Sequence, residues 1–572
     1  MSKRQISRTF TSHFFILLLM SSLCCPGVRA AIPGGFTTKA IGQSNPLTDG
    51  ANTITVTLVT DTDVLASDSS VVTISGLLNA IAESPITLID AGDTGHTMFS
   101  DGSTQGKGAW SSGTLTLTVH TNLTAGANYT LAFQITNPSS VQPAQTISIA
   151  ASGAATFELA DMSVPGVNIF GVTGGANPLL VVEPTFNVKS IQQNTPLSGS
   201  TNTITVTLTA NIDLADGSSV TILGLTGSQT NDASLTVTST SGLLGVTGTW
   251  TKAEGKLVLT AEAGGTSAGA ACEVKFNLMN SAQQQSSLAV SVVASIQDGS
   301  SNSVGSIAQA AMTKPGTTLY GVANGADPLT VEVPAFSVKS IQQSSTSPGA
   351  LNSITITLTT NFNLPDGSTV TILGLIGSLT ASSSSLSIAS TSSILGIQGV
   401  WTQDSGVLLL TAESGGMLAA TPCTVTFSLT NPESDHTSPL VRVEASIIEN
   451  SSPVAHIALS TMTKPEAALC GVENGAAPLT VLVYLSCPGG TFPGETQCET
   501  CPAGYFCNIN STHPLPCPAG TEGRVSGLAS VSHCVTCATG YIAPSAGSAN
   551  CTQCPAGYSC PTPSSIGSQF KR

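Results

Sequence analysis

The segment Thr53-Ile54-Thr55-Val56-Thr57-Leu58 alternates hydroxyl and aliphatic side chains. A period of two is typical of a β-strand that has one face in the core and the other in water. The pattern returns at 203–208 as Thr-Ile-Thr-Val-Thr-Leu and at 353–358 as Ser-Ile-Thr-Ile-Thr-Leu, so the interval is 150 residues. That period is the size of a domain, well above the roughly 20–50 residues of a solenoid unit. The sequence therefore predicts three tandem copies of one β domain.

Other landmarks keep the same interval. The segment Phe36-Thr-Thr-Lys39-Ala-Ile41 recurs at 186–191 and 336–341, and methionines stand at 162, 312 and 462. A tract with the pattern Gly-Val-x-x-Gly-Ala-x-Pro-Leu begins at Gly171, Gly321 and Gly471. The predicted boundaries are 1–30 for a signal peptide, 31–180, 181–330 and 331–482 for the three repeats, and 483–572 for a cysteine-rich module.

Each repeat is predicted to be an antiparallel β-sandwich. The segments at 220–225 and 370–375 are a second alternating strand, and each follows an Asp-Gly-Ser turn. The segments around Trp110, Trp250 and Trp401 resemble hairpins with glycine at the turn. No copy contains a long segment of helical period, so the expected fold class is all-β, with about eight or nine strands per repeat.

Composition limits the possible partners. The 572-residue chain has a net charge of −15, and only 9% of its residues are charged. Proteins that bind nucleic acid need a basic surface, so this balance argues against that class.

The first 30 residues are typical of a secretory signal. Lys3, Arg4 and Arg8 precede an apolar run at 14–23, and Val28-Arg29-Ala30 forms a small-residue cleavage site. The apolar run is shorter than the roughly 20 residues that span a bilayer, although an uncleaved anchor is the alternative. No transmembrane segment is predicted after it. The expected location is secreted or extracellular, including the cell surface, where cysteines oxidise.

Five Asn-x-Ser/Thr sequons follow the signal and are candidate glycosylation sites. They lie at Asn122, Asn128, Asn450, Asn510 and Asn550.

Three recurring residue types are candidates for ligand contact. Trp110, Trp250 and Trp401 are interpreted as core residues, with stacking on a ligand as the alternative. Lys39, Lys189 and Lys339 are interpreted as solvent-side residues that protect a strand edge, with a ligand-binding cation as the alternative. Asp216 and Asp366 each place one carboxylate in a turn, which falls short of a calcium cage. No metal or other cofactor is predicted.

One string is typical of a nucleophilic serine, namely Gly265-Thr-Ser267-Ala-Gly269. A nucleophile elbow needs a preceding strand, a following helix, and histidine and acidic partners. Here another strand is expected to follow, and the other repeats lack the string. The sequence therefore predicts that the protein is not an enzyme.

The cysteines form two populations. Cys272 and Cys423 occupy equivalent places on the apolar face of a strand, so both are expected to be free and buried. Cys470 replaces Phe170 and Tyr320 of the earlier repeats, and joining the next module is a possibility for it.

The remaining ten cysteines are crowded into the C-terminal module, which has few large apolar side chains. Such a segment needs cross-links to stay folded, and each disulfide stabilises the folded state by about 2–4 kcal/mol. Disulfides are favoured over Cys₄ zinc sites in an exported chain, and the spacing does not decide their partners. The predicted disulfide cysteines are Cys487, Cys498, Cys501, Cys507, Cys517, Cys534, Cys537, Cys551, Cys554 and Cys560.

Residues 487–560 resemble the cysteine-rich repeats called tyrosine-kinase ephrin type A/B receptor-like, which are similar to growth-factor-receptor modules. The resemblance rests on Cys501-Pro-Ala-Gly-Tyr-Phe-Cys507, Cys517-Pro-Ala-Gly520 and Cys554-Pro-Ala-Gly-Tyr-Ser-Cys560. It implies an extracellular, receptor-like or matrix-like context. It does not imply a kinase, because no segment resembles a kinase glycine-rich loop, catalytic loop or Asp-Phe-Gly motif. The three repeats loosely resemble immunoglobulin-like or cohesin-like modules.

The predicted function is multivalent adhesion or structural support, with an extracellular protein or glycan as the partner, because linked weak sites gain avidity. Two alternatives remain open. One is a carbohydrate-binding array, and the other is the ectodomain of a larger membrane receptor.

Overall fold

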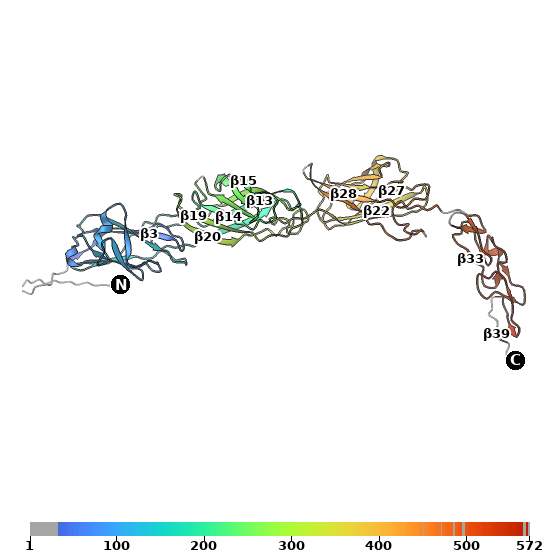
Figure 1. Cartoon of the computed structure of the whole chain (residues 1–572), viewed down its shortest axis with the longest axis horizontal. Helices are drawn as coiled ribbons and strands as arrows, with labels where there is room; N and C mark the ends of the chain where they lie inside the picture. The colour runs from blue at the N-terminus through green and yellow to red at the C-terminus, as the bar shows by residue number, and fades with distance from the viewer. Residues whose placement is uncertain are drawn as a thin grey trace, which may run out of the picture. The chain divides into compact units, whose positions relative to one another are not determined.

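The structure is a computed structural model, and it describes residues 32–262, 264–413, 415–449, 451–470, 472–483, 487–494, 498–563 and 568–569. The predicted signal peptide and the sequon at Asn450 lie outside the described residues. The predicted all-β fold is confirmed. Figure 1 shows the β domains and the disulfide-rich stretch following one another along the chain, from blue to red. Among the described residues, no helix has the length and apolar character needed to cross a membrane.

The second repeat is a nine-stranded antiparallel sheet. Its order is β12 (Phe186–Gln193), β13 (Thr201–Ala210), β18 (Cys272–Met279), β15 (Ala233–Ser239), β16 (Thr247–Thr251), β17 (Lys256–Thr260), β14 (Ser219–Leu223), β19 (Ser291–Gln297) and β20 (Ser303–Ala311). Ser190 of β12 also pairs in parallel with Thr313, just beyond β20, so the two ends of the sheet meet.

Alternation along the strands builds the core of this repeat. In β13, Ile204, Val206 and Leu208 are buried, whereas the threonines between them are half-buried on the outer face. Removing apolar side chains from water is the main favourable contribution to folding. Residues that recur at the 150-residue interval therefore share their burial in the core as well as their sequence pattern.

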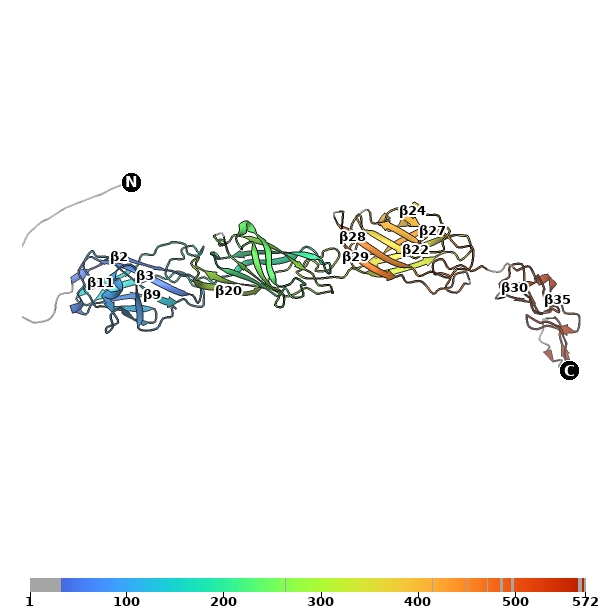
Figure 2. The same cartoon turned by 45° about the horizontal axis from the view of Figure 1, so that its top comes forward.

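The third repeat has the same strand order. It runs β21 (Phe336–Gln343), β22 (Leu351–Thr360), β27 (Cys423–Thr430), β24 (Ser383–Ser390), β25 (Gln398–Thr402), β26 (Val407–Thr411), β23 (Thr369–Leu373), β28 (Arg442–Glu449) and β29 (Ser452–Thr461). Figure 2 shows β28 beside β29 and β22 beside β27, as in the pairing. Ser340 closes this sheet onto Thr463.

The first repeat is an eleven-stranded variant of the same sheet. Its main path is β1 (Ile32–Gly34), β11 (Ala155–Asp161), β10 (Ser148–Ser152), β4 (Val71–Ser75), β8 (Thr114–Val119), β7 (Lys107–Ser111), β5 (Ile86–Asp90), β9 (Tyr129–Thr136), β3 (Ala51–Thr60) and β2 (Phe36–Gln43). β6 (Phe99–Ser100) pairs with β8. Strand β1 has no counterpart in the other repeats and pairs with β11 in parallel.

The predicted hairpins are present in all three repeats. The tryptophan strands β7, β16 and β25 pair with β8, β17 and β26. Gly113, Gly255 and Gly406 adopt positive φ values of 77°, 58° and 61° at the turns, a region that favours glycine.

The C-terminal stretch is a series of five two-stranded ladders stapled by five disulfides. The pairs are β30 (Thr491–Pro493) with β31 (Cys498–Thr500), β32 (Tyr505–Phe506) with β33 (Leu515–Pro516), β34 (Thr521–Glu522) with β35 (Val535–Thr536), β36 (Tyr541–Ile542) with β37 (Thr552–Gln553), and β38 (Tyr558–Ser559) with β39 (Ser568–Gln569). Its buried apolar cluster contains only Phe506, Cys517 and Leu528 among the described residues. Covalent bridges therefore replace the missing core.

Candidate functional site: recurring contacts of the tandem repeats

A buried cluster of three amide side chains recurs in every repeat. In the third repeat, Asn352 Nδ2 donates to Gln343 Oε1 at 2.7 Å and to Asn431 Oδ1 at 2.8 Å. All three side chains are buried. We call this set, together with Gln43, Asn52 and Asn137 in the first repeat and Gln193, Asn202 and Asn280 in the second, the amide cluster.

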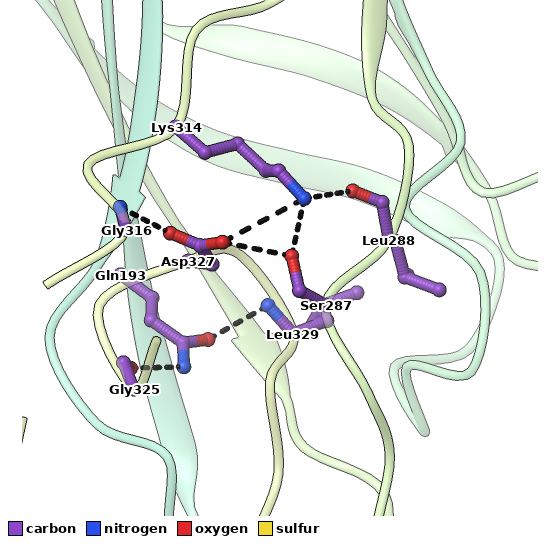
Figure 3. Close-up of polar contacts among 8 residues, drawn as sticks. All are labelled: Gln193, Ser287, Leu288, Lys314, Gly316, Gly325, Asp327 and Leu329. Carbon is purple, nitrogen blue, oxygen red and sulfur yellow. Dashed lines mark hydrogen bonds and ion pairs between the residues drawn. The ribbon is translucent and has the colours of Figure 1, made fainter. Parts of the chain in front are cut away.

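The amide cluster anchors the glycine-rich tract to the sheet. Gln193 Nε2 donates to Gly325 O at 2.7 Å, and Leu329 N donates to Gln193 Oε1 at 2.7 Å (Figure 3). Gln193 Nε2 also donates to Thr330 O at 2.8 Å. A buried amide is costly unless its donors and acceptors are satisfied. The glycine-rich tract supplies the hydrogen-bond partners of Gln193. These bonds fix a strand residue to a loop about 130 residues later in the sequence.

Sequence reasoning missed these residues. The signal was present, because Gln43, Gln193 and Gln343 keep the 150-residue interval. A glutamine in an alternating strand is easily interpreted as a solvent-facing residue. Only the tertiary contact shows that its amide faces a loop inside the domain.

The second repeat adds an ion pair to the same tract. Lys314 Nζ lies 3.6 Å from Asp327 Oδ2, which also accepts a hydrogen bond from Ser287 Oγ at 2.9 Å. Figure 3 shows the Lys314 ammonium directed at Ser287 and at Leu288 O, the latter 3.0 Å away. Gly316 N donates to Asp327 Oδ1 at 2.8 Å. Both carboxylate oxygens of Asp327 therefore bond to groups that fix the loop.

This ion pair is specific to one repeat. In the third repeat, the equivalent Lys464 donates to Ser438 and Pro439, and alanine at 477 replaces the carboxylate. In the first repeat, Val164 stands in place of the lysine and Asn177 in place of the aspartate. The arrangement stabilises the loop of the second repeat and is no shared reactive centre.

An aromatic residue links the first repeat to the second. Phe170, at a φ of 49°, packs against the core of the second repeat, and its carbonyl accepts a hydrogen bond from Asp213 N at 2.9 Å. A Cβ added to the next residue, Gly171, would lie 2.4 Å from Asp213 Oδ1. The chain therefore leaves the first repeat through a close contact with the second.

Tyr320 makes the equivalent contact with the third repeat. Its carbonyl accepts from Asn363 N at 2.9 Å, and its ring stacks on Phe362 with the centroids 5.4 Å apart. The hydroxyl donates to Glu449. Burial, followed by the neighbouring Glu449 carboxylate, raises the pKa of Tyr320. Residues 320–322 accordingly belong to the compact unit that contains the third repeat.

The tryptophans are core residues, as the favoured interpretation predicted. Trp250 and Trp401 are each 1% exposed, and their indole N–H groups donate to Thr230 O and Thr380 O. Trp110 is also buried. The alternative of stacking on a ligand is wrong, because no open ring face remains.

Three of the recurring charged residues, Asp216, Asp366 and Lys189, bond to the protein's own backbone. Asp216 and Asp366 accept hydrogen bonds from Gly264 N and Gly415 N at 2.8 and 2.7 Å, respectively. Lys189, half-buried, donates to Phe186 O at 3.2 Å, and Lys39 and Lys339 are likewise half-buried. No group of three His, Cys, Asp or Glu side chains within the part of the chain that the structure describes is arranged to hold a metal ion.

Ser267 lies in an exposed turn. The next regular element is strand β18, where a nucleophile elbow would have a helix. Its segment therefore lacks the geometry of an activated serine.

The cysteines of the repeats lie at two kinds of place. Cys272 and Cys423 are buried free thiols on β18 and β27, and burial raises the pKa of each thiol. Cys470 is exposed, with a φ of 52°. That φ matches the values of Phe170 and Tyr320 at the equivalent positions.

The ten C-terminal cysteines pair in sequence order. The bridges are Cys487–Cys498, Cys501–Cys507, Cys517–Cys534, Cys537–Cys551 and Cys554–Cys560. Each pair joins neighbours along the chain, a connectivity that the spacing alone left open.

One turn recurs five times beside these bridges. Gly490, Gly504, Gly520, Gly540 and Gly557 adopt φ values of 90°, 89°, 88°, 89° and 88°, respectively. Each occupies the third position of a turn closed by a hydrogen bond, such as Tyr505 N to Pro502 O at 3.1 Å. This is a type II turn, which needs glycine there. Successive turns are joined, since Cys517 N donates to Gly504 O at 2.9 Å.

The described sequons lie at the surface. Asn122, Asn128, Asn510 and Asn550 are all exposed. Asn128 donates to Thr130 Oγ1 of its own sequon at 3.2 Å.

Comparisons with known proteins give limited information. No protein-family model matches the chain. Thyroglobulin of Rattus norvegicus is 40% identical over 53 residues, and the match covers 9% of this chain and 2% of thyroglobulin. The chain thus corresponds to a very small part of that relative's length.

Solved structures align only weakly. The major pilin SpaD of Corynebacterium diphtheriae is 10% identical, with 73% of this chain and 92% of the pilin covered and a TM-score of 0.21. A putative membrane-anchored protein of the same organism is 12% identical over 77% of this chain and 93% of its own, with a TM-score of 0.17. The collagen adhesin of S. aureus is 10% identical over 48% and 92%, with a TM-score of 0.16. Alignments of this quality carry no argument about the whole chain.

Proposed function

We propose that the chain is an extracellular adhesion or structural protein that works through several linked domains. The observation that carries this proposal is the repeated docking contact. Phe170 and Tyr320 directly precede equivalent glycine-rich tracts, and each packs against the repeat that follows it. Domains linked in this way act together, so weak contacts on separate repeats add up through a high effective concentration.

The domain boundaries are part of the proposal. The repeats span 31–180, 181–330 and 331–482, and the cysteine-rich module spans 483–572. Residues 170–172 and 320–322 extend from one repeat into the next. A boundary in sequence therefore lies several residues after the physical contact.

The cysteine-rich module is proposed to be ephrin-receptor-like. Five consecutive bridges and five equivalent glycine turns support a repeated extracellular module. Export by the signal peptide at 1–30 and glycosylation at Asn122, Asn128, Asn450, Asn510 and Asn550 belong to the same proposal. The net charge of −15 argues against nucleic acid as a partner.

Two other functions compete with this one. A carbohydrate-binding array loses its main support, since the tryptophans of all three repeats are buried. A receptor ectodomain remains compatible with a cysteine-rich module that follows β repeats. Its distinguishing feature is a membrane anchor in a longer form of the protein.

A density series tests the proposal. Beads coated with graded amounts of the exported chain are passed over immobilised extracellular matrix proteins and over a glycan array. Multivalent adhesion predicts retention that rises more steeply than coating density on at least one surface. Retention on no surface, or retention strictly proportional to density, would contradict it. Saturable binding of the soluble monomer to one glycan would favour the carbohydrate-binding alternative.

A further inference from the structure

The last strand of the third repeat has an open outer edge. Strand β29 pairs with β28 on one side, and no strand or isolated bridge among the described residues pairs with the other. Its ten residues, Ser-Pro-Val-Ala-His-Ile-Ala-Leu-Ser-Thr, include no lysine, arginine or carboxylate. Val454 and Leu459 are 37% and 44% exposed. An exposed edge without lysine, arginine or carboxylate side chains is a template for pairing with another strand.

The equivalent edge in the first repeat is occupied. Strand β1 pairs in parallel with β11, with Ile32 opposite Ala155, Pro33 opposite Thr156 and Gly34 opposite Phe157. Positions 155–157 correspond to 455–457 across two periods of 150 residues. The fold itself therefore shows which kind of segment this edge accepts.

The chain that precedes the third repeat is used elsewhere. Residues 332–334 correspond to 32–34, but Glu332 pairs in parallel with Leu197. Its N–H donates to Pro196 O at 2.7 Å. Proline at 334 also replaces Gly34. This segment therefore does not cover β29.

The second repeat covers its edge by other means. Asn45 Nδ2 donates to Val304 O of β20 at 2.9 Å. A Cβ added to Gly305 would lie 2.9 Å from Leu47 Cδ1, so Leu47 contacts the same edge. The edge of β29 thus differs from both of its counterparts.

The segment Ile32-Pro33-Gly34 fits the open edge. A Cβ at Gly34 would lie 2.2 Å from the Phe157 ring, so only glycine fits there. In β29 the facing residue is Ile457, which is buried like Phe157, and Ala455 matches Ala155. Pro453 lacks a backbone N–H and would disfavour strand pairing, but it lies before the proposed pairing residues 455–457.

We propose that residues 455–457 of β29 bind the Ile32–Gly34 segment of a second copy of this chain in parallel register. Once the proposed signal peptide is removed, this three-residue strand lies at the start of the chain and opens at low free energy, so it is available for exchange. Each copy donates one segment and offers one edge, so the contact is heterologous, head to tail. The inference is independent of the proposed ligand of the repeats.

A labelled peptide tests the site. The peptide Ala-Ile-Pro-Gly-Gly-Phe-Thr, residues 31–37, carries a fluorophore and a photo-crosslinker and is titrated into the full exported chain. The expected result is saturable binding, with the crosslink on β29. The same peptide with Gly34→Val should not bind, because the added side chain meets the edge residue.

Matched variants of the full chain complete the test. Val454→Lys places a charge on the edge and should weaken peptide binding by at least about fivefold. Val400→Lys, at an exposed position on β25, should leave it unchanged. Deleting residues 32–34 should abolish concentration-dependent self-association in sedimentation velocity.

Three results of the peptide assay would overturn the inference. They are no binding at about 1 mM peptide, equal binding by the two lysine variants, or a crosslink confined to β11. The last result would mean that the peptide only displaces its own chain's β1. Unchanged self-association after the deletion would also refute it.

Discussion

The amide cluster shows how single residues specify the repeat. In the third repeat, each of its three side chains bonds both to another amide and to the backbone of the glycine-rich tract or of a neighbouring loop. Buried polar networks of this kind are stabilising only when they are complete. A loss at one residue therefore affects partners on three segments.

Asn352→Ala is expected to destabilise the third repeat by about 3 kcal/mol, since Gln343 and Asn431 lose a buried partner. The measurement is the opening free energy from amide hydrogen exchange of β22 peptides. Thr355→Ala, on the outer face of the same strand, is the control and should cost less than about 0.5 kcal/mol. Equal costs for the two variants would contradict the role of the amide cluster.

Tyr320 makes the docking contact sensitive to alkaline pH. Because the pKa of Tyr320 is raised in the folded state, its stabilisation is complete below the ordinary tyrosine pKa of about 10 and declines as the pH rises above that value. Tyr320→Phe removes the titrating group. The difference in Tm between the wild type and this variant, measured from about pH 8 to pH 11, should shrink at the alkaline end. A constant difference would show that Tyr320 ionisation has no part in docking.

At the scale of elements, the cysteine-rich module depends on one repeated turn. Its glycines share a φ near 90°, but their surroundings differ. A Cβ at Gly504 would lie 2.3 Å from Gly547 O, whereas a Cβ at Gly557 would meet nothing within 4 Å. Backbone strain is therefore common to the five turns, and close packing is specific to some of them.

Gly557→Ala is expected to cost about 1 kcal/mol through backbone strain alone. Gly504→Ala should cost clearly more, because the same strain is joined by a steric overlap with the neighbouring loop. Amide hydrogen exchange across 501–560 measures both, with the Cys517 N–H reporting on the joint to Gly504. If Gly557→Ala proves as costly as Gly504→Ala, the close contact contributes nothing.

At the scale of the whole molecule, docking makes neighbouring repeats depend on each other. The first two repeats lie in one compact unit, with Phe170 packed on the core of the second. The strand edges add a second property at this scale. Of the three equivalent edges, that of β11 carries β1 and that of β20 is contacted by Asn45 and Leu47. The edge of β29 has no strand partner among the described residues, which directs attention to contacts between copies.

Phe170→Ala should weaken the coupling between the first two repeats by about 1–2 kcal/mol, because a half-buried ring is removed. Differential scanning calorimetry should show their unfolding transitions moving apart. Leu159→Ala, at a side chain that is 68% exposed, is the control and should leave the thermogram unchanged. Transitions that stay together in Phe170→Ala would place the coupling elsewhere.

Much of the fold could be predicted, because its signals are local and periodic. Alternation at 53–58 predicted a strand, the 150-residue interval predicted three equivalent domains, and glycine placed the turns of the tryptophan hairpins. The candidate site was harder to predict. Gln193 lies 134 positions before Asp327 in the sequence. Nothing in either local sequence shows that Gln193 bonds to the tract that contains Asp327.

The sequence by itself determined the all-β class, the three-fold repetition and the need for disulfides in a module with little core. Strand period, turn residues and composition act over a few positions, so they are visible along the chain. Only the tertiary structure decided that the tryptophans are closed to ligands, how the cysteines pair, and where Phe170 and Tyr320 dock. It also decided which strand edge lacks a partner among the described residues. Each of these depends on contacts between distant segments, which form only when the chain folds and which no local pattern encodes.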